Sequence, residues 1–186
     1  MISTLKDTIK NNLLAVYAQH RNRLKRKKAG QDKQANLTGI VGLLYTAELN
    51  NPQKTDAVIR AVEKIKASGK QVHVLCYVPN KYIMLNKHIH SFTKEDINFL
   101  GKTKHEALAN FLKTRFEYLY HLDMHSEPLL DYVVASCSAK CKIGNLAANR
   151  SYLFEVSFKG LAEPNENMDF DSLIHKMLDY IKMLHI

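Results

Sequence analysis

The chain contains 186 residues, of which 46% are hydrophobic and 24% are charged, a composition typical of one globular domain with a buried core. No apolar run approaches the roughly 20 residues that a membrane-spanning helix requires, and the first residues lack the layout of a secretory signal. Three cysteines at irregular spacings do not make a disulfide framework. We therefore expect a cytoplasmic protein whose partner is not a membrane.

The formal net charge of +9 is concentrated near the N-terminus. Residues 1–34 contain nine lysines and arginines but only two aspartates, a net charge of +7, whereas the rest of the chain carries +2. Such an asymmetry is typical of a protein with a polyanionic partner. The predicted organisation is a basic N-terminal helix with its linker over residues 1–36, followed by an α/β domain over residues 37–186.

Residues 1–28 are predicted to form one long helix, because apolar side chains recur in steps of three and four. The recurring positions are Ile2, Leu5, Ile9, Leu13, Val16 and Leu24, and His20 fills the gap between the last two. This face predicts packing against an apolar surface, and a protein partner is one candidate. Beyond Leu24, cationic side chains point to every side. A helix on a membrane would keep its apolar face, whereas counterion release from nucleic acid rewards charge in all directions.

The basic run is therefore a candidate nucleic-acid interface, with RNA as the preferred partner. The residues that would contact phosphates are Arg21, Arg23, Lys25, Arg26, Lys27 and Lys28. Two other interpretations stay open, namely a solvated helix end and a contact with an acidic protein. No zinc finger or RNP signature accompanies the run, so the charge by itself does not separate RNA from DNA.

The rest of the chain alternates between strand and helix patterns. Apolar runs at 39–46 and 71–78 enclose a helical pattern at 53–68, a βαβ unit that favours a parallel sheet. The later predicted elements are a helix at 103–114 opened by a capping box of Thr103 and Glu106, a strand at 116–122, a helix beginning near Ser126 and Pro128, a very short strand at 142–144, a longer strand at 151–158, and a helix at 169–184. Together they predict a Rossmann-like α/β fold, with a mostly parallel sheet of four or five strands flanked by helices and preceded by the basic helix.

The best pocket candidate follows the predicted strand at 116–122. Ligands of open α/β sheets bind beyond the carboxyl ends of the strands, where polar residues of two strands would meet. These residues are Thr46, Glu48, Asp123, His125, Ser126 and Glu127. Lys140 and Lys142 flank a predicted turn and would bring two cations close to this cleft. In a purely structural interpretation, Ser126 caps a helix, and Glu127 and the lysines complement helix dipoles.

Common active-site motifs are absent from the sequence. After the first predicted strand the chain runs TAELNNPQ, without the glycines of a dinucleotide fingerprint or a Walker loop. No G-x-S-x-G elbow is present. Cys137, Cys141, His121 and His125 make a poor zinc set, because His121 is expected in a strand and its spacing would not bring both rings together. We assign no cofactor, metal or catalytic residue, and we leave enzymatic activity open while favouring binding.

The stretch Phe116–Gly144, FEYLYHLDMHSEPLLDYVVASCSAKCKIG, carries a family resemblance. Its order of strand, aspartate, helix and Ser-x-Ala-Lys-x-x-x-Gly resembles a small uncharacterised bacterial family, known as a domain of unknown function. The upstream segments GIVGLLY, VHVLCYV and FTKEDINFLGK resemble that family too. The resemblance implies a Rossmann-like fold and does not indicate any activity. The same stretch is faintly similar to the N-terminal domain of heptosyltransferase-type glycosyltransferases, which need a second Rossmann domain, so no catalytic residue is carried over.

These observations lead to three functional hypotheses. The first is a non-enzymatic RNA-associated protein, with the ribosome as a candidate partner, that contacts phosphates through the basic helix. The second is a small-molecule-binding or transferase-like α/β domain whose cleft includes Asp123, His125, Lys140 and Lys142. The third is an adaptor that binds a partner protein through the apolar face of the N-terminal helix.

Overall fold

The structure is a computed structural model that describes most of the α/β domain and a short piece of the N-terminal helix. The described residues are 8, 10, 12–17, 39–48, 51–79, 89–98, 100–123, 126–145, 152–158 and 170–183, with side chains as far as residue 179. The six basic residues Arg21, Arg23, Lys25, Arg26, Lys27 and Lys28 lie outside them, as does His125. Among the described residues, no helix is both long and apolar enough to cross a membrane.

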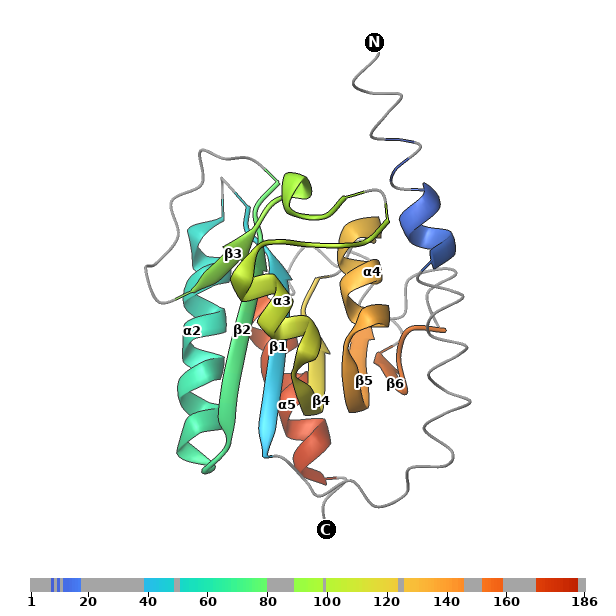
Figure 1. The fold of residues 1–186 in the computed structure, drawn as a ribbon. Helices are drawn as coiled ribbons and strands as arrows, with labels where there is room; N and C mark the ends of the chain where they lie inside the picture. Colours follow the sequence, from blue (N-terminus) through green and yellow to red (C-terminus); the bar gives the residue numbers. More distant parts are fainter. Residues whose placement is uncertain are drawn as a thin grey trace.

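The described strands form one parallel sheet in the order β3-β2-β1-β4-β5-β6 (Figure 1). Their bounds are β1 Ile40–Thr46, β2 Gln71–Tyr77, β3 His90–Phe92, β4 Arg115–His121, β5 Ser138–Asn145 and β6 Val156–Phe158. The predicted Rossmann-like α/β fold is confirmed. The sheet has six strands instead of four or five, because the three-residue strand β3, which the sequence does not predict, extends one edge. Strands of that length are too short to show a period in the sequence.

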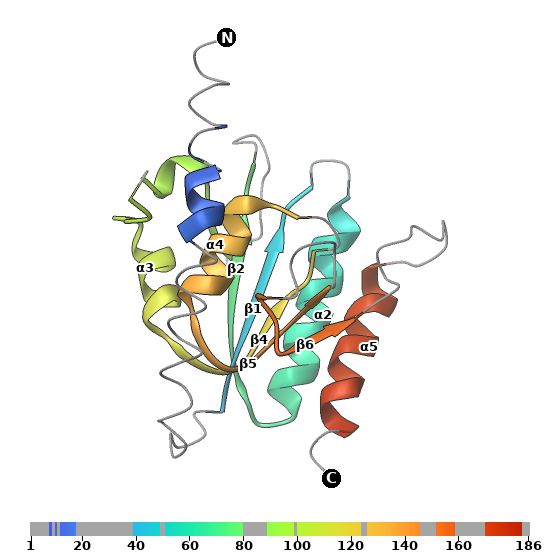
Figure 2. The ribbon, with the colours of Figure 1, turned by 90° about the vertical axis from the view of Figure 1, so that its right-hand side faces the viewer.

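Helices cover both faces of the sheet (Figure 2). Their bounds are α2 Pro52–Ala67, α3 Glu106–Lys113, α4 Pro128–Ser136 and α5 Phe170–Met183, and a short 3-10 helix, η1, spans Lys94–Asp96. Helices α2 and α5 pack on one face, and α3 and α4 on the other. Because both faces are covered, the central strands are apolar at consecutive positions, as at Leu43, Leu44 and Tyr45, which are at most 1% exposed.

The close packing of β1 on β4 depends on a glycine. Gly42 lies opposite Leu119 in the register of the two strands. A Cβ atom at residue 42 would lie 2.8 Å from Cδ1 of Leu119 and 2.9 Å from Cε1 of Phe116. Any larger residue would therefore displace side chains of the core.

Two helices begin later than the sequence predicts. Helix α3 is capped by His105, whose Nδ1 accepts the N–H of Leu108 at 3.4 Å, whereas Thr103 only accepts the N–H of His105. Helix α4 is capped by Glu127 instead of Ser126. Serine and threonine are the commoner caps, so a composition-based prediction favours them over histidine and glutamate.

The lengths of the last two strands are the reverse of the prediction. Strand β5 has eight residues and pairs with β4 from Ser138 onward, although its first half, SAKCK, is largely polar. Strand β6 has only three residues, and the preceding Leu153 and Phe154 are buried outside the strand. Pairing with β4 satisfies the backbone N–H and C=O groups of β5. The pattern of side chains along the segment does not indicate such pairing. Cys137 caps the C-terminus of α4 and Cys141 lies in β5, so the two cysteines do not lie on one helical face.

The described part of the N-terminal helix lies beside α4 (Figures 1 and 2). Leu14 is only 1% exposed and belongs to the core cluster that α3 and α4 share. The Lys10 ammonium donates to the carbonyl oxygen of Lys94. Leu13 and Val16, two members of the predicted apolar stripe, are 45% and 64% exposed. The described part of the helix therefore contacts the domain through Leu14 and Lys10, neither of which is a member of that stripe.

Candidate functional site

The strand order creates a crevice between β1 and β4. From β1 the chain continues through α2 to β2 on one side of the sheet, whereas β4 lies on the other side of β1 and continues to β5. At such a switch point the connections leave in opposite directions and open a crevice outside the carboxyl ends of the strands. Strand β1 ends at Thr46 and β4 ends at His121.

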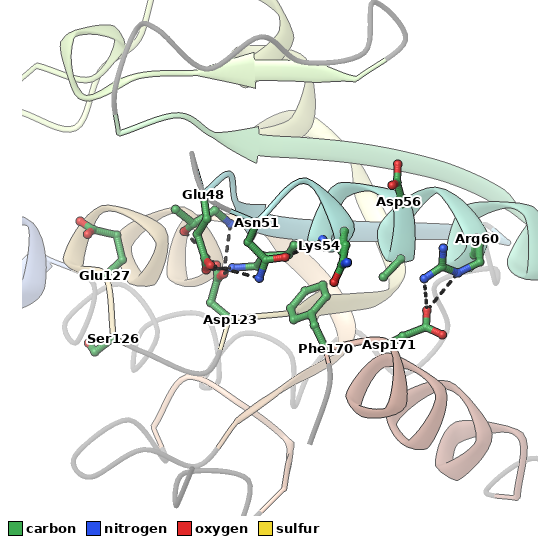
Figure 3. Close-up of a pocket in the computed structure, with 13 residues that line it drawn as sticks. Glu48, Asn51, Lys54, Asp56, Arg60, Asp123, Ser126, Glu127, Phe170 and Asp171 are labelled. Atoms are coloured by element: carbon green, nitrogen blue, oxygen red, sulfur yellow. Dashed lines mark hydrogen bonds and ion pairs between the residues drawn. The ribbon is translucent and has the colours of Figure 1, made fainter. Parts of the chain in front are cut away.

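A pocket of about 830 Å³ lies at this point (Figure 3), a volume in the range of small-molecule sites. We refer to it as the switch-point pocket. Its lining residues come from the ends of β1 and β4 and from the starts of α2, α4 and α5. They are Thr46, Glu48, Asn51, Gln53, Lys54, Asp56, Ala57, Arg60, Asp123, Ser126, Glu127, Phe170 and Asp171.

The Asp123 carboxylate follows β4 and is held by donors from β1 and α2, across the switch point. From the end of β1, the backbone N–H of Thr46 donates to Oδ1 at 3.1 Å and the Thr46 hydroxyl donates to Oδ2 at 3.0 Å. From α2, the Lys54 ammonium donates to Oδ1 at 2.7 Å. Asp123 and Lys54 are 5% and 4% exposed. Three donors thus satisfy a buried carboxylate, as a charge in such a place requires.

Lys54 has a second anionic partner and an aromatic neighbour. Its Nζ lies 2.5 Å from Oε1 of Glu48, whose side chain is 48% exposed. The same Nζ lies 5.0 Å from the centroid of the Phe170 ring. Burial by itself would lower the pKa of Lys54, but the charges and hydrogen bonds of Asp123 and Glu48 outweigh burial and raise that pKa above its ordinary value. Lys54 is therefore protonated at neutral pH.

The first turn of α2 is capped by its own residues. The Asn51 side chain accepts the N–H of Lys54 at 3.2 Å, and Pro52 occupies the first position of the helix. The Asn51 amide donates to Oε2 of Glu48 at 3.4 Å. In dinucleotide-binding folds the corresponding helix N-terminus receives the pyrophosphate. Here a carboxylate lies beside it.

Two further features shape the rim of the pocket. The Arg60 guanidinium contacts Oδ1 of Asp171 at 3.0 Å through a terminal nitrogen and at 3.2 Å through Nε, which links α2 to the start of α5. At the start of α4, burial raises the pKa of the Glu127 carboxyl above its ordinary value. Glu127 also accepts the N–H of Leu129 as the helix cap.

Several residues that the sequence singled out do meet in this pocket. Thr46, Glu48, Asp123, Ser126 and Glu127 all line it, because the carboxyl ends of neighbouring parallel strands lie at one edge of the sheet.

The two lysines of the predicted cleft lie elsewhere. Lys140 and Lys142 belong to β5, and neither is among the described residues that line the pocket. Lys140 is exposed in the first half of the strand, and Lys142 is buried opposite Leu119 in the middle of the sheet. The predicted turn at this position is wrong, because the segment is extended and paired with β4.

Lys54, Arg60 and Phe170 are lining residues that the sequence analysis did not single out. A usable signal for Lys54 was present in the sequence. It lies on the buried face of α2 with Ala57, Val58, Ala61 and Ile65, and a lysine on the apolar face of a helix is rarely buried unless it is paired. Arg60 and Phe170 carry no such signal, since their position depends on how α5 packs against α2.

Comparison with known proteins identifies the family but no activity. No curated protein and no solved structure matches the chain, so the predicted likeness to heptosyltransferase-type enzymes has no support. A family model described as "Family of unknown function (DUF6913)" matches residues 14–184. This match agrees with the resemblance to an uncharacterised family that Phe116–Gly144 carries. The chain therefore belongs to the DUF6913 family of unknown function.

Proposed function

We propose that the protein binds a small molecule in the switch-point pocket. The observation that carries the proposal is the buried ion pair of Lys54 and Asp123, which borders a cavity of about 830 Å³ at the reversal of the strand order. Ligand sites of open α/β sheets are found at this point.

A contribution to the stability of the fold does not by itself explain why a buried ion pair is present. Removing two charges from water costs several kcal/mol per ion, and apolar residues of similar volume often serve as well or better. A pair that borders a cavity can instead orient a ligand through the oxygens and nitrogens that it keeps in place. The location of the pair therefore supports a binding role.

The chemistry of the described lining favours binding over catalysis. Its titratable groups are five carboxylates, one lysine and one arginine. Lys54 has a raised pKa, so it is neither a general base nor a nucleophile at neutral pH. Asp123 already accepts three hydrogen bonds. These residues are suited to recognise a ligand, and no proton-transfer step follows from their arrangement.

A screen of soluble metabolites by ligand-observed NMR tests this proposal. We expect compounds that bind the wild-type protein, keep binding to Asp179→Asn, and bind at least tenfold more weakly to Glu48→Gln, since a hydrogen bond to a charged group contributes about 1.5–3 kcal/mol. Asp179 is an exposed residue of α5 outside the pocket, which makes it a control for the loss of one charge. An absence of hits, or hits that bind all three proteins equally, contradicts the proposal.

Binding of RNA through the basic run is a second proposed function. Its support is the net charge of +7 in residues 1–34, which contrasts with +2 in the rest of the chain. The six residues from Arg21 to Lys28 would contact phosphates, and the ribosome is a candidate source of the RNA. Each phosphate contact on single-stranded nucleic acid contributes about −0.7 to the slope of log K against log salt.

Filter binding with single-stranded RNA at several salt concentrations tests the second proposal. Replacing Arg21, Arg23, Lys25, Arg26, Lys27 and Lys28 by glutamine should abolish binding and most of its salt dependence. A matched control replaces the exposed residues Lys66, Lys102, Lys104, Lys113, Lys140 and Lys176 by glutamine, with the same loss of charge. Equal affinity of both variants overturns the proposal.

A further inference from the structure

We infer that the switch-point pocket takes a cationic, amine-bearing small molecule and excludes phosphorylated compounds. This inference rests on the proposed binding function and adds the chemical class of the ligand. It is unexpected for this strand order, because folds with the same order commonly bind nucleotides at the switch point.

At four described positions where a phosphate could be held, no backbone N–H is free. The N–H of Thr46 donates to Asp123, the N–H of Ala47 donates to the carbonyl oxygen of Tyr77 at 2.8 Å, and the N–H of Lys54 is capped by Asn51. Pro52, at the first position of α2, has no N–H. A phosphate depends on free N–H groups at a helix N-terminus, and these four positions offer none.

The charge of the described lining also disfavours an anion. The lining contains five carboxylates and two cations, a net charge of −3. Both cations are already paired, Lys54 with Asp123 and Glu48, and Arg60 with Asp171. A phosphorylated ligand would therefore meet unbalanced negative charge, and water inside a pocket screens that charge less than bulk solvent does.

Glu48 is the carboxylate best placed to receive a ligand cation. Asp123 is 5% exposed and its oxygens accept three hydrogen bonds, whereas the Glu48 side chain is 48% exposed. An incoming ammonium can replace Lys54 at Glu48 while Lys54 keeps its bond to Asp123. Figure 3 shows Glu48 on the side of the pocket that also presents Asn51.

An apolar surface lies next to this acceptor. Ala57 and Phe170 line the same cavity, and the Phe170 ring already has a cation at 5.0 Å from its centroid. Aromatic faces attract ammonium groups. The pocket thus matches an amine whose carbon chain lies against Ala57 and Phe170 and whose ammonium contacts Glu48.

A series of four-carbon probes separates charge from size. Putrescine, 1,4-butanediol and succinate have the same chain length and carry positive, zero and negative charge, and ATP serves as the phosphorylated probe. Each probe is titrated into the protein at low ionic strength while the chemical shifts of the backbone amides are recorded by NMR. These shifts give both the affinity of the probe and the residues that it contacts. We expect putrescine to shift the amides of Glu48, Lys54 and Phe170, and we expect no shift there from succinate or ATP.

A pair of isosteric variants shows whether the carboxylate matters. Glu48→Gln should weaken putrescine binding roughly tenfold, the loss of about 1.4 kcal/mol. Glu63→Gln removes the same charge from the exposed side of α2, outside the pocket, and should leave the affinity unchanged. Equal affinity of the two variants overturns the inference, because binding would then reflect net charge alone.

The remaining outcomes separate this inference from the proposed function. If succinate, ATP or mainly anionic screening hits bind at these amides more tightly than putrescine, the cationic ligand class is wrong while ligand binding stands. If neither the four probes nor the metabolite screen perturbs the pocket, the proposed function itself is wrong. Putrescine binding at Glu48 with anionic compounds rejected supports both.

Discussion

The Lys54 ammonium lies 2.7 Å from Oδ1 of Asp123, although the two residues are 69 positions apart in the chain. This contact joins the first turn of α2 to the segment that follows β4, across the point where the strand order reverses. Both side chains are about 5% exposed. The contact therefore links the stability of the fold to the geometry of the switch-point pocket.

Removing one partner of this pair should be costly. Asp123→Ala leaves the Lys54 charge without its buried partner and removes the acceptor of two Thr46 bonds. We expect the free energy of unfolding to fall by about 3–5 kcal/mol, measured by urea denaturation. Asp179→Ala, which breaks an exposed ion pair with Lys64, should cost at most about 1 kcal/mol. Similar losses for both variants would contradict a buried pair.

Replacing both partners should separate stability from binding. In the double variant Lys54→Met with Asp123→Leu, two apolar side chains fill a similar volume, and such replacements of buried pairs are often neutral or stabilising. We expect the double variant to regain most of the stability that Asp123→Ala loses and yet to bind no ligand in the switch-point pocket. A double variant that unfolds as readily as the single one would show that the pair is not interchangeable with apolar packing.

The docking of the N-terminal helix is tested by two adjacent leucines. Leu14 is 1% exposed and Leu13 is 45% exposed, so they form a matched pair with the same substitution. Leu14→Ala should lower the free energy of unfolding by about 2–5 kcal/mol, whereas Leu13→Ala should change it by less than about 0.5 kcal/mol. Urea denaturation, with limited proteolysis of the N-terminal segment, measures both. The reverse order would show that the predicted stripe, and not Leu14, contacts the domain.

Stability should fall at alkaline pH because of a buried thiol. Burial raises the pKa of Cys76 from 9.0 to about 12, so the folded state keeps a proton that the unfolded state loses above pH 9. Because the folded state binds more protons, the free energy of unfolding decreases with rising pH, by about 1.4 kcal/mol per unit between these two values. Cys76→Ala should show a shallower decrease in denaturation experiments from about pH 8 to 10.5. Parallel pH profiles of the two proteins would contradict this account.

The exposed apolar side chains of the N-terminal helix offer a test of the adaptor hypothesis. Leu13, Val16 and Tyr17 are 45–64% exposed. A partner protein that packs on them should stay bound at high salt, because apolar contacts are not screened, and should be lost with Leu13→Ser and Val16→Ser. Binding that disappears at high salt and survives these substitutions would instead favour the basic run.

The sequence by itself determined the position of those helices and strands whose apolar residues follow a clear pattern of burial. The apolar runs of β1, β2 and β4 and the periodicity of α2 and α5 predict those elements to within about two residues of their observed bounds. The reason is that β1 and β4 are buried at nearly every position, whereas α2 and α5 each bury one apolar face. The parallel arrangement follows from the βαβ order. From it, Asp123, Ser126 and Glu127 could be placed with Thr46 and Glu48 at one edge of the sheet.

Only the tertiary structure decided the rest, because it depends on pairings between distant segments. Strand β3 is too short to have a pattern, β6 is shorter than its apolar run predicts, and the polar first half of β5 is a strand because β4 lies beside it. The same pairing removes Lys140 and Lys142 from the cleft. Lys54 enters the pocket because β4 lies next to β1, which brings Asp123 within 2.7 Å of a lysine on the buried face of α2. The pattern of apolar residues along a segment indicates how much of that segment is buried, but it does not indicate which other segment packs against it.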